Sequence, residues 1–155
     1  MRLISFNKIR PLSNDEGDAR MSVTAVQHDY FMQIGDEIFA GLHYVLDIFD
    51  ANRLDDVAWV LSAMRGAAQA ANASILHDYM HPFGPEQGVS GVLVLAESHI
   101  SVHTWPERAY AAFDVFMCGN TQPQKAISFL KACWPNAQYS VNCFKRGVAL
   151  HDNLD

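Results

Sequence analysis

The sequence predicts an α+β fold in which an antiparallel sheet carries its helices on one face. Two observations support this prediction. Short apolar runs typical of strands outnumber the helical segments, and they follow one another too closely for βαβ crossovers. The 155 residues are half apolar and 18% charged, which is the composition of one compact domain.

The first residues differ in character from the rest. Residues 1–28 are mixed and polar, so we expect a poorly ordered N-terminal extension, followed by a single domain over residues 29–155. The extension lacks the long apolar stretch of a secretory leader. We therefore expect a cytoplasmic protein.

A hairpin and a helix are expected next. Two strand-like runs flank Gly35-Asp36, a pair suited to a tight turn, and the second run continues to Phe49. A helix is expected from about Leu54, with Asp55 and Asp56 in its first turn, where carboxylates suit the helix dipole.

The second half of the chain contains most of the predicted sheet. Strand-like runs separated by Gly or Pro cover residues 74–79, 89–95, 99–105 and 110–117. The tract PQKAISFLKACW predicts a second helix with Pro123 near its first position. AQYSVNCF predicts a last strand, and a polar tail follows from Lys145.

Charge and cysteine usage exclude several classes. A formal net charge of −6 argues against nucleic acid as the main partner, and no apolar run approaches the ~20 residues that span a bilayer. The three cysteines Cys118, Cys133 and Cys143 form no CxxC pair, so we expect free thiols and no metal site.

The tract LAESHISVHTW, residues 95–105, concentrates reactive side chains where a core strand should continue. Strand alternation places His99, Ser101, His103 and Trp105 on one face. Cys118 ends the next predicted strand, and a thiol near a histidine of a neighbouring strand can serve as a proton donor or a nucleophile. The spacing allows this chemistry without demanding it.

Three interpretations of the residues remain open at this point. Ser98, His99 and His103 could be satisfied polar residues at a strand edge. A metal site of His99, His103 and Cys118 is disfavoured, because histidines four residues apart on a strand lie ~13 Å from each other. A Cys-His hydrolase lacks a clearly placed Asn or Asp to orient its base.

The tract GVSGVLVLAESHISVHTWPERAYAAFDVFMCG, residues 88–119, closely resembles the signature region of the prokaryotic S-adenosylmethionine decarboxylases. These are pyruvoyl-dependent, self-cleaving enzymes of polyamine synthesis. A looser resemblance extends from FAGLH, residues 39–43, to about Gly147. The resemblance implies a sandwich fold of this family, completed by dimerisation.

Self-processing is the first activity that the resemblance implies. The chain would be cut between Glu97 and Ser98, after the Ser98 hydroxyl attacks the Glu97 carbonyl to give an ester. Elimination and hydrolysis would leave a pyruvoyl group at residue 98. Ser90 matches the hydroxyl that assists cleavage, and His103 matches the residue that helps to remove the Ser98 α-proton. Such a site needs donors for the developing oxyanion.

Decarboxylation is the second implied activity. The pyruvoyl ketone would form a Schiff base with the substrate amine and act as an electron sink. Cys118 matches the family's acid that reprotonates the product carbon. Phe83 and Trp105 match aromatic residues near the adenine, and Glu107 matches an acid that accepts hydrogen bonds from the ribose.

The expected function is therefore conversion of S-adenosylmethionine to its decarboxylated form for spermidine synthesis, by a homodimer of cleaved protomers. The tract HPFGPEQGVSG holds one residue more than the commonest family spacing, and family members that act on arginine or ornithine exist. The same chemistry on those amino acids is thus one alternative. A catalytically silent regulatory homologue is another.

Overall fold

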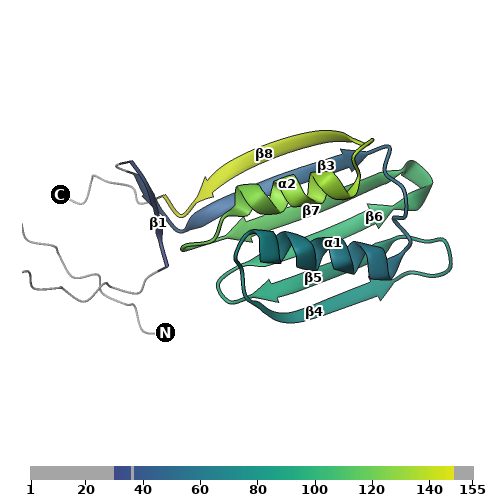
Figure 1. The fold of residues 1–155 in the computed structure, drawn as a ribbon, viewed down its shortest axis with the longest axis horizontal. Coiled ribbons are helices and arrows are strands. Elements are labelled where there is room, and N and C mark those ends of the chain that lie inside the picture. Colours follow the sequence, from purple (N-terminus) through teal and green to yellow (C-terminus); the bar gives the residue numbers. More distant parts are fainter. Residues whose placement is uncertain (1–29, 36, 149–155) are drawn as a thin grey trace, which may run out of the picture.

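A six-stranded antiparallel sheet with two helices on one face forms the body of the protein (Figure 1). The structure is a computed structural model, which describes residues 30–35 and 37–148. The predicted α+β class is confirmed. The expected extension over residues 1–28 lies outside the described residues. No helix in the described part of the chain is long and apolar enough to span a membrane.

The strands are not arranged in chain order. The elements are β1 (Met32–Ile34), β2 (Glu37–Phe39), β3 (Gly41–Phe49), α1 (Val57–Ala70), β4 (Ile75–Pro82), β5 (Val89–Leu95), β6 (His99–Trp105), a short 3₁₀ helix (Pro106–Arg108), β7 (Tyr110–Met117), α2 (Pro123–Cys133) and β8 (Gln138–Arg146). The large sheet has the order β4-β5-β6-β7-β3-β8, and β1 pairs with β2 in a separate hairpin. The early strand β3 therefore lies between two late strands.

The predicted hairpin around Gly35 is present, but its second strand does not continue to Phe49 as expected. Strand β2 ends at Phe39, and the next residue, Ala40, lies in neither strand. Its N–H donates to the carbonyl of Arg146 at 2.8 Å. Beyond this point β3 joins the large sheet between β7 and β8. The local sequence does not mark this break, because the hydrogen-bond partner of Ala40 lies about a hundred residues further along the chain.

The first helix begins later than predicted. It starts at Val57 rather than near Leu54, and Asp56 is its N-cap instead of a first-turn residue. The Asp56 carboxylate accepts the Trp59 N–H at 2.9 Å, which satisfies a donor that the helix leaves unpaired. The second helix begins at Pro123, as predicted.

Two strands are longer than their sequence patterns indicated. Strand β4 extends beyond Tyr79 to Pro82, and β8 includes Lys145 and Arg146, which we expected in a polar tail. Both strands are edges of the sheet, where alternation between core and solvent is weak. The pattern therefore marks their ends poorly.

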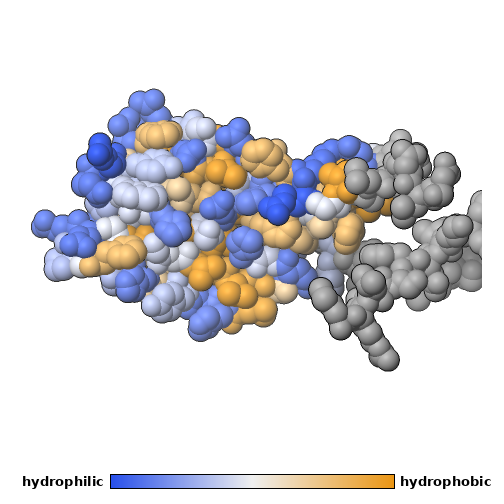
Figure 2. Space-filling view, turned by 180° about the vertical axis from the view of Figure 1, so that it is seen from behind, coloured by the Kyte–Doolittle hydropathy of each residue, from blue (hydrophilic) through white to orange (hydrophobic). Residues whose placement is uncertain are grey.

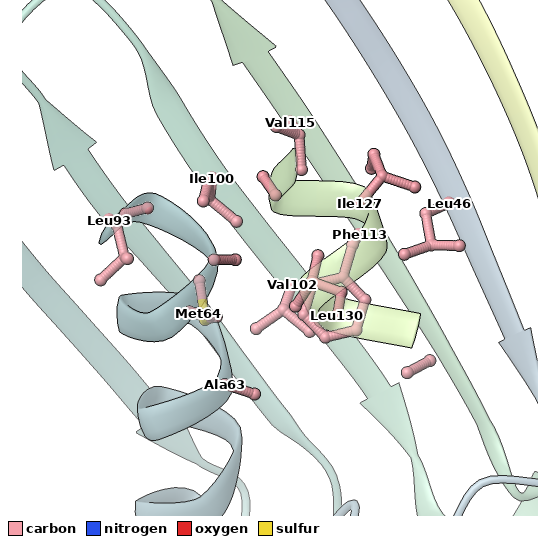
Figure 3. Packing of buried hydrophobic residues seen from close by; sticks show 14 of the residues in the cluster. Leu46, Ala63, Met64, Leu93, Ile100, Val102, Phe113, Val115, Ile127 and Leu130 are labelled. Atoms are coloured by element: carbon pink, nitrogen blue, oxygen red, sulfur yellow. The ribbon is translucent and has the colours of Figure 1, made fainter. Parts of the chain in front are cut away.

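The core lies between the sheet and the two helices (Figure 3). Leu46, Ile100 and Phe113 of the sheet are fully buried against Met64 of α1 and Leu130 of α2. Burial of each such side chain stabilises the fold by about 1.5–3 kcal/mol. The opposite face of the sheet carries no helix, and apolar and polar side chains mix on it (Figure 2). The reactive side chains of β6 lie on this helix-free face.

Candidate active site

Strand β6 carries the candidate residues on its helix-free face. Ile100, Val102 and Thr104 are buried on the helix side, whereas His99 and Ser101 are half-buried and His103 and Trp105 are exposed. The predicted alternation is confirmed. Thr104 also fixes this strand, because its buried hydroxyl accepts the Val89 N–H at 2.7 Å and donates to the Leu54 carbonyl at 2.7 Å.

At the start of β6, a tight turn presents Glu97 and Ser98. The Leu95 N–H donates to the Ser98 carbonyl at 2.9 Å and closes the turn between β5 and β6. The Cys118 N–H donates to Ser98 Oγ at 3.2 Å. A backbone amide therefore fixes the Ser98 hydroxyl at the turn, while Glu97 remains exposed.

The thiol of Cys118 is buried directly after β7. Burial is the main cause that raises its pKa above the ordinary value, and the nearby Glu97 carboxylate raises it further. The thiol is therefore protonated at neutral pH and can donate a proton. The absence of a side chain at Gly41 leaves it room, because a Cβ there would lie 2.9 Å from Cys118 Sγ and 2.5 Å from the Met117 carbonyl oxygen.

A second group lies towards the other end of β6. Ser90 of β5 and His103 of β6 are cross-strand partners, and Ser90 Oγ lies 2.7 Å from His103 Nδ1. With Nδ1 unprotonated, the serine hydroxyl donates to the ring. The pair can then move a proton between a hydroxyl and an imidazole.

The Ser90–His103 pair opens into a pocket with a volume of about 530 Å³. Its lining comprises Phe83, Glu86, Gln87, Gly88, Ser90, His103, Thr104, Trp105 and Glu107. Phe83 and Trp105 are 58% and 39% exposed, so both rings are open to a ligand. Two flat aromatic rings and two carboxylates, those of Glu86 and Glu107, in a pocket of this size suit a ligand with a base and vicinal hydroxyls.

The structure divides the predicted site residues into two groups. Phe83, Ser90, His103, Trp105 and Glu107 surround one pocket, whereas Glu97, Ser98 and Cys118 lie at the opposite end of β6. Five residues of extended strand separate Ser98 from His103, or about 16 Å. Within one chain, His103 does not reach the Ser98 α-carbon.

A polar network between these groups was not predicted. Arg146 donates to His43 Nδ1 at 3.2 Å, so the proton of His43 lies on Nε2, which contacts Asp114 Oδ1 at 3.1 Å. Ser101 donates to the other oxygen of Asp114. Asp114 lies on the helix-free face of β7, and His43 of β3 and Arg146 of β8 reach it because β3 pairs with both β7 and β8.

His99 completes this central region. Burial lowers the pKa of His99 below its ordinary value, and the neighbouring His43 lowers it further, whereas Asp114 opposes the shift. The two imidazole ring centroids lie 6.5 Å apart. His99 is therefore neutral at physiological pH. It directly follows Ser98 in the chain.

Comparisons with known proteins identify the family to which this chain is similar. A family model described as S-adenosylmethionine decarboxylase matches residues 42–147. The chain is 43% identical over 109 residues to the S-adenosylmethionine decarboxylase proenzyme of Parasynechococcus marenigrum (strain WH8102). The aligned residues cover 68% of this chain and 84% of that protein. Identity to the proenzyme of the same name from Acidithiobacillus ferrooxidans (strain ATCC 53993 / BNL-5-31) is 43% over 115 residues, or 74% and 83% of the two chains.

The fold has a solved counterpart. The crystal structure of the adenosylmethionine decarboxylase from Aquifex aeolicus VF5 superposes with a TM-score of 0.66 and 28% identity, over 76% of this chain and 98% of that one. The region matched by the family model begins within β3 and ends just after β8. It therefore contains the large sheet, both helices and every candidate site residue.

Proposed function

The chain belongs to the S-adenosylmethionine decarboxylase family, and on this premise we propose that it is a self-processing enzyme that removes CO₂ from S-adenosylmethionine. The observation that carries the proposal is the Ser98 hydroxyl, held by the Cys118 amide at an exposed turn directly after Glu97. The product would supply aminopropyl groups for spermidine in the cytoplasm.

Processing uses only groups of the chain and water. Ser98 Oγ bonds to the Glu97 carbonyl carbon as the peptide C–N bond breaks, which converts the amide into an ester. Removal of the Ser98 α-proton then breaks the Cβ–Oγ bond and expels the main-chain carboxylate of Glu97, the new C-terminus. This carboxylate keeps the oxygen that was Ser98 Oγ. The Cys118 N–H that donates to Oγ would stabilise the negative charge that develops on this oxygen as the carboxylate leaves. Hydrolysis of the remaining unsaturated amine releases ammonia and leaves a pyruvoyl group at residue 98.

The surroundings of residue 98 fit a pyruvoyl group. The half-buried position is flanked by a backbone donor and by a protonated thiol, and neutral His99 adds no charge beside it. A ketone here would supply the electron sink for decarboxylation. Cys118 would hold the proton for the product carbon, because its raised pKa keeps the thiol protonated.

The pocket at the other end of β6 would bind the nucleoside. Phe83 and Trp105 offer ring faces for the adenine, and Glu107 offers two oxygens to the ribose hydroxyls. Pro106 restricts the backbone between Trp105 and Glu107, which favours a fixed relation between ring and carboxylate.

A second copy of the chain would bring the two groups together. A two-fold axis that crosses β6 near its middle, with two helix-free faces in contact, would set the His103 end of one copy over the Ser98 end of the other. The active form would then be a homodimer in which Ser90 and His103 of one protomer act on Ser98 of its partner. This arrangement removes the separation of about 16 Å along a single β6 strand.

Denaturing mass analysis of purified protein tests the proposal. Fragments 1–97 and 98–155 are expected, with the second blocked to amino-terminal sequencing, together with CO₂ release from carboxyl-labelled S-adenosylmethionine. Ser98→Ala should remain one inactive chain. A parent chain that is uncut yet fully active, or a Ser98→Ala variant with normal turnover, would contradict the mechanism.

A further inference from the structure

Three aromatic rings form a continuous stack across the helix-free face beside the pocket. Tyr110 of β7 pairs in register with Phe49 of β3 on one side and with Trp105 of β6 on the other. Its ring stacks on both, with centroids 5.2 Å apart and interplanar angles of 27° in each pair. Tyr110 is thus the central ring of the stack.

The Tyr110 ring is also fixed at its hydroxyl. The phenol donates to Asp47 Oδ1 at 2.6 Å, and Asp47 lies two residues before Phe49 on the same face of β3. This hydrogen bond is the first cause that raises the pKa of Tyr110 to about 12. The phenol therefore remains a donor over the physiological range, and the ring is held both at its faces and at its tip.

Trp105 depends on this support because it stands at the rim of the pocket. Its indole is 39% exposed, and it closes the strand just before the turn that carries Glu107. The His103 ring is tilted by 38° to the indole, with its centroid 6.2 Å away. Of these two rings, that of Tyr110 is the one stacked on the Trp105 indole.

We propose that Tyr110, tethered by Asp47 and backed by Phe49, is a positioning residue that holds the Trp105 indole in place as a wall of the nucleoside pocket. This inference rests on the proposed function, since it assigns Trp105 to the adenine. A ring that is already fixed loses little freedom when a base stacks on it, so the tether favours binding. The stack consists of Phe49, Tyr110 and Trp105 and includes neither Ser90 nor His103, so self-cleavage should not depend on Tyr110.

The test compares substitutions at Tyr110 with a matched loss of a tyrosine hydroxyl elsewhere. Tyr110→Leu should raise KM for S-adenosylmethionine, and Kd for the nucleoside probe 5′-methylthioadenosine, by about threefold to tenfold, the scale of a lost aromatic pair. Tyr110→Phe should give a smaller increase. Self-cleavage and kcat should stay near those of the parent. Tyr139→Phe, whose hydroxyl donates to Lys131 and Trp134 carbonyls beside α2, should leave all these quantities unchanged.

Substitutions of Asp47 separate the tether from general packing. Asp47→Asn keeps an oxygen acceptor for the phenol and should retain near-parental affinity, whereas Asp47→Leu should reproduce the loss seen with Tyr110→Phe. The double variant Tyr110→Phe/Asp47→Leu should be no worse than either single variant, because both remove the same bond. Additive losses would overturn the tether.

The possible failures point to different conclusions. A parent enzyme that binds neither S-adenosylmethionine nor 5′-methylthioadenosine would refute the proposed nucleoside pocket, and this inference with it. A parent that binds both, with Tyr110→Leu and Tyr110→Phe equal to it in KM, would overturn the inference alone. A Tyr110→Phe variant with reduced cleavage and unchanged KM would likewise overturn it, because that result indicates a general structural role.

Discussion

The two ends of β6 hold their reactive groups in different ways. At the Ser98 end, a backbone amide positions the hydroxyl, and the neighbouring thiol is buried beside Gly41. At the Trp105 end, side chains position one another through a Ser–His contact and ring stacking, and they open into a pocket. The first end suits a reaction of the chain itself, and the second suits a ligand that comes and goes. Substitutions of Trp105 and Glu107 should therefore affect ligand binding alone, whereas cleavage should depend on the Ser98 end together with the Ser90–His103 pair.

The strongest test of this comparison asks whether the two ends cooperate between chains. Ser98→Ala and His103→Ala should each remain uncut when expressed alone. When they are expressed together, mixed dimers should contain one intact composite site, so the His103→Ala chain should be cleaved and activity should return. Random mixing would restore at most about one site in four. Denaturing electrophoresis with one tagged chain measures the cleavage.

A failure of this experiment is equally informative. If co-expressed chains form mixed dimers, verified by the tag, yet neither chain is cut, then His103 of one protomer does not act on Ser98 of its partner and the composite site is wrong. Ser98→Ala can likewise be co-expressed with Ser90→Ala. If neither chain is cut in those mixed dimers, then Ser90 does not act on Ser98 of the partner either.

The second prediction separates proton donation from cleavage at the Ser98 end. Cys118→Ala keeps the backbone N–H that contacts Ser98 Oγ, so substantial self-cleavage should persist. Decarboxylation should fall by ~10²–10⁴-fold, the usual contribution of a positioned proton donor. Cys133→Ala is the matched control, because burial also raises the pKa of that thiol, on α2 away from Ser98. Normal turnover of Cys118→Ala would refute its role as the acid.

The third prediction concerns the pocket end alone. Glu107→Gln should weaken binding of S-adenosylmethionine by about 1–3 kcal/mol, the scale of hydrogen bonds to a charged group, and should spare cleavage. Glu37→Gln, on the hairpin outside the pocket, is the control. Arginine and ornithine should be poor substrates, since neither has a base or a ribose. Rapid turnover of either amino acid, with none of S-adenosylmethionine, would overturn the assigned substrate.

The smallest expected effect is a pH dependence of stability at His99. Its folded-state pKa lies below the ordinary value of 6.5, so the unfolded chain takes up a proton more readily as the pH falls through 6.5. The free energy of unfolding should therefore decrease below that pH and be unaffected by His99 above it. In His99→Gln, the decrease in Tm between about pH 7 and pH 5 should be shallower than in the parent. An equal or steeper decrease in the variant would contradict the burial of neutral His99.

Local patterns predicted most of the strands and the face on which β6 carries its functional side chains. They did so because alternation depends on a period of two residues, which a short sequence window contains. The break at Ala40 and the contacts of His43 depend on Arg146, about a hundred residues away, and no local pattern encodes that pairing.

The candidate site shows the same limit. The family resemblance implied that Ser90 and His103 act on Ser98, but the structure places them at the other end of β6 in the same chain. The separation arises because β6 is extended, so five residues span most of the strand instead of one turn of a helix. The stack around Tyr110 joins β3, β7 and β6, and its three members are distant in sequence or separated by a turn. Only the sheet order brings them together.

The sheet order also determines what a cut after Glu97 would do to the molecule. The first fragment would contain β3, β4, β5 and α1, and the second would contain β6, β7, α2 and β8. Since β3 lies between β7 and β8, the fragments would be interlocked along three strand boundaries, β5–β6, β7–β3 and β3–β8. They would stay associated without a covalent link. Once unfolded, however, two separate chains would have to meet by diffusion, so refolding would depend on protein concentration and the mature protein would rely on slow unfolding for its lifetime.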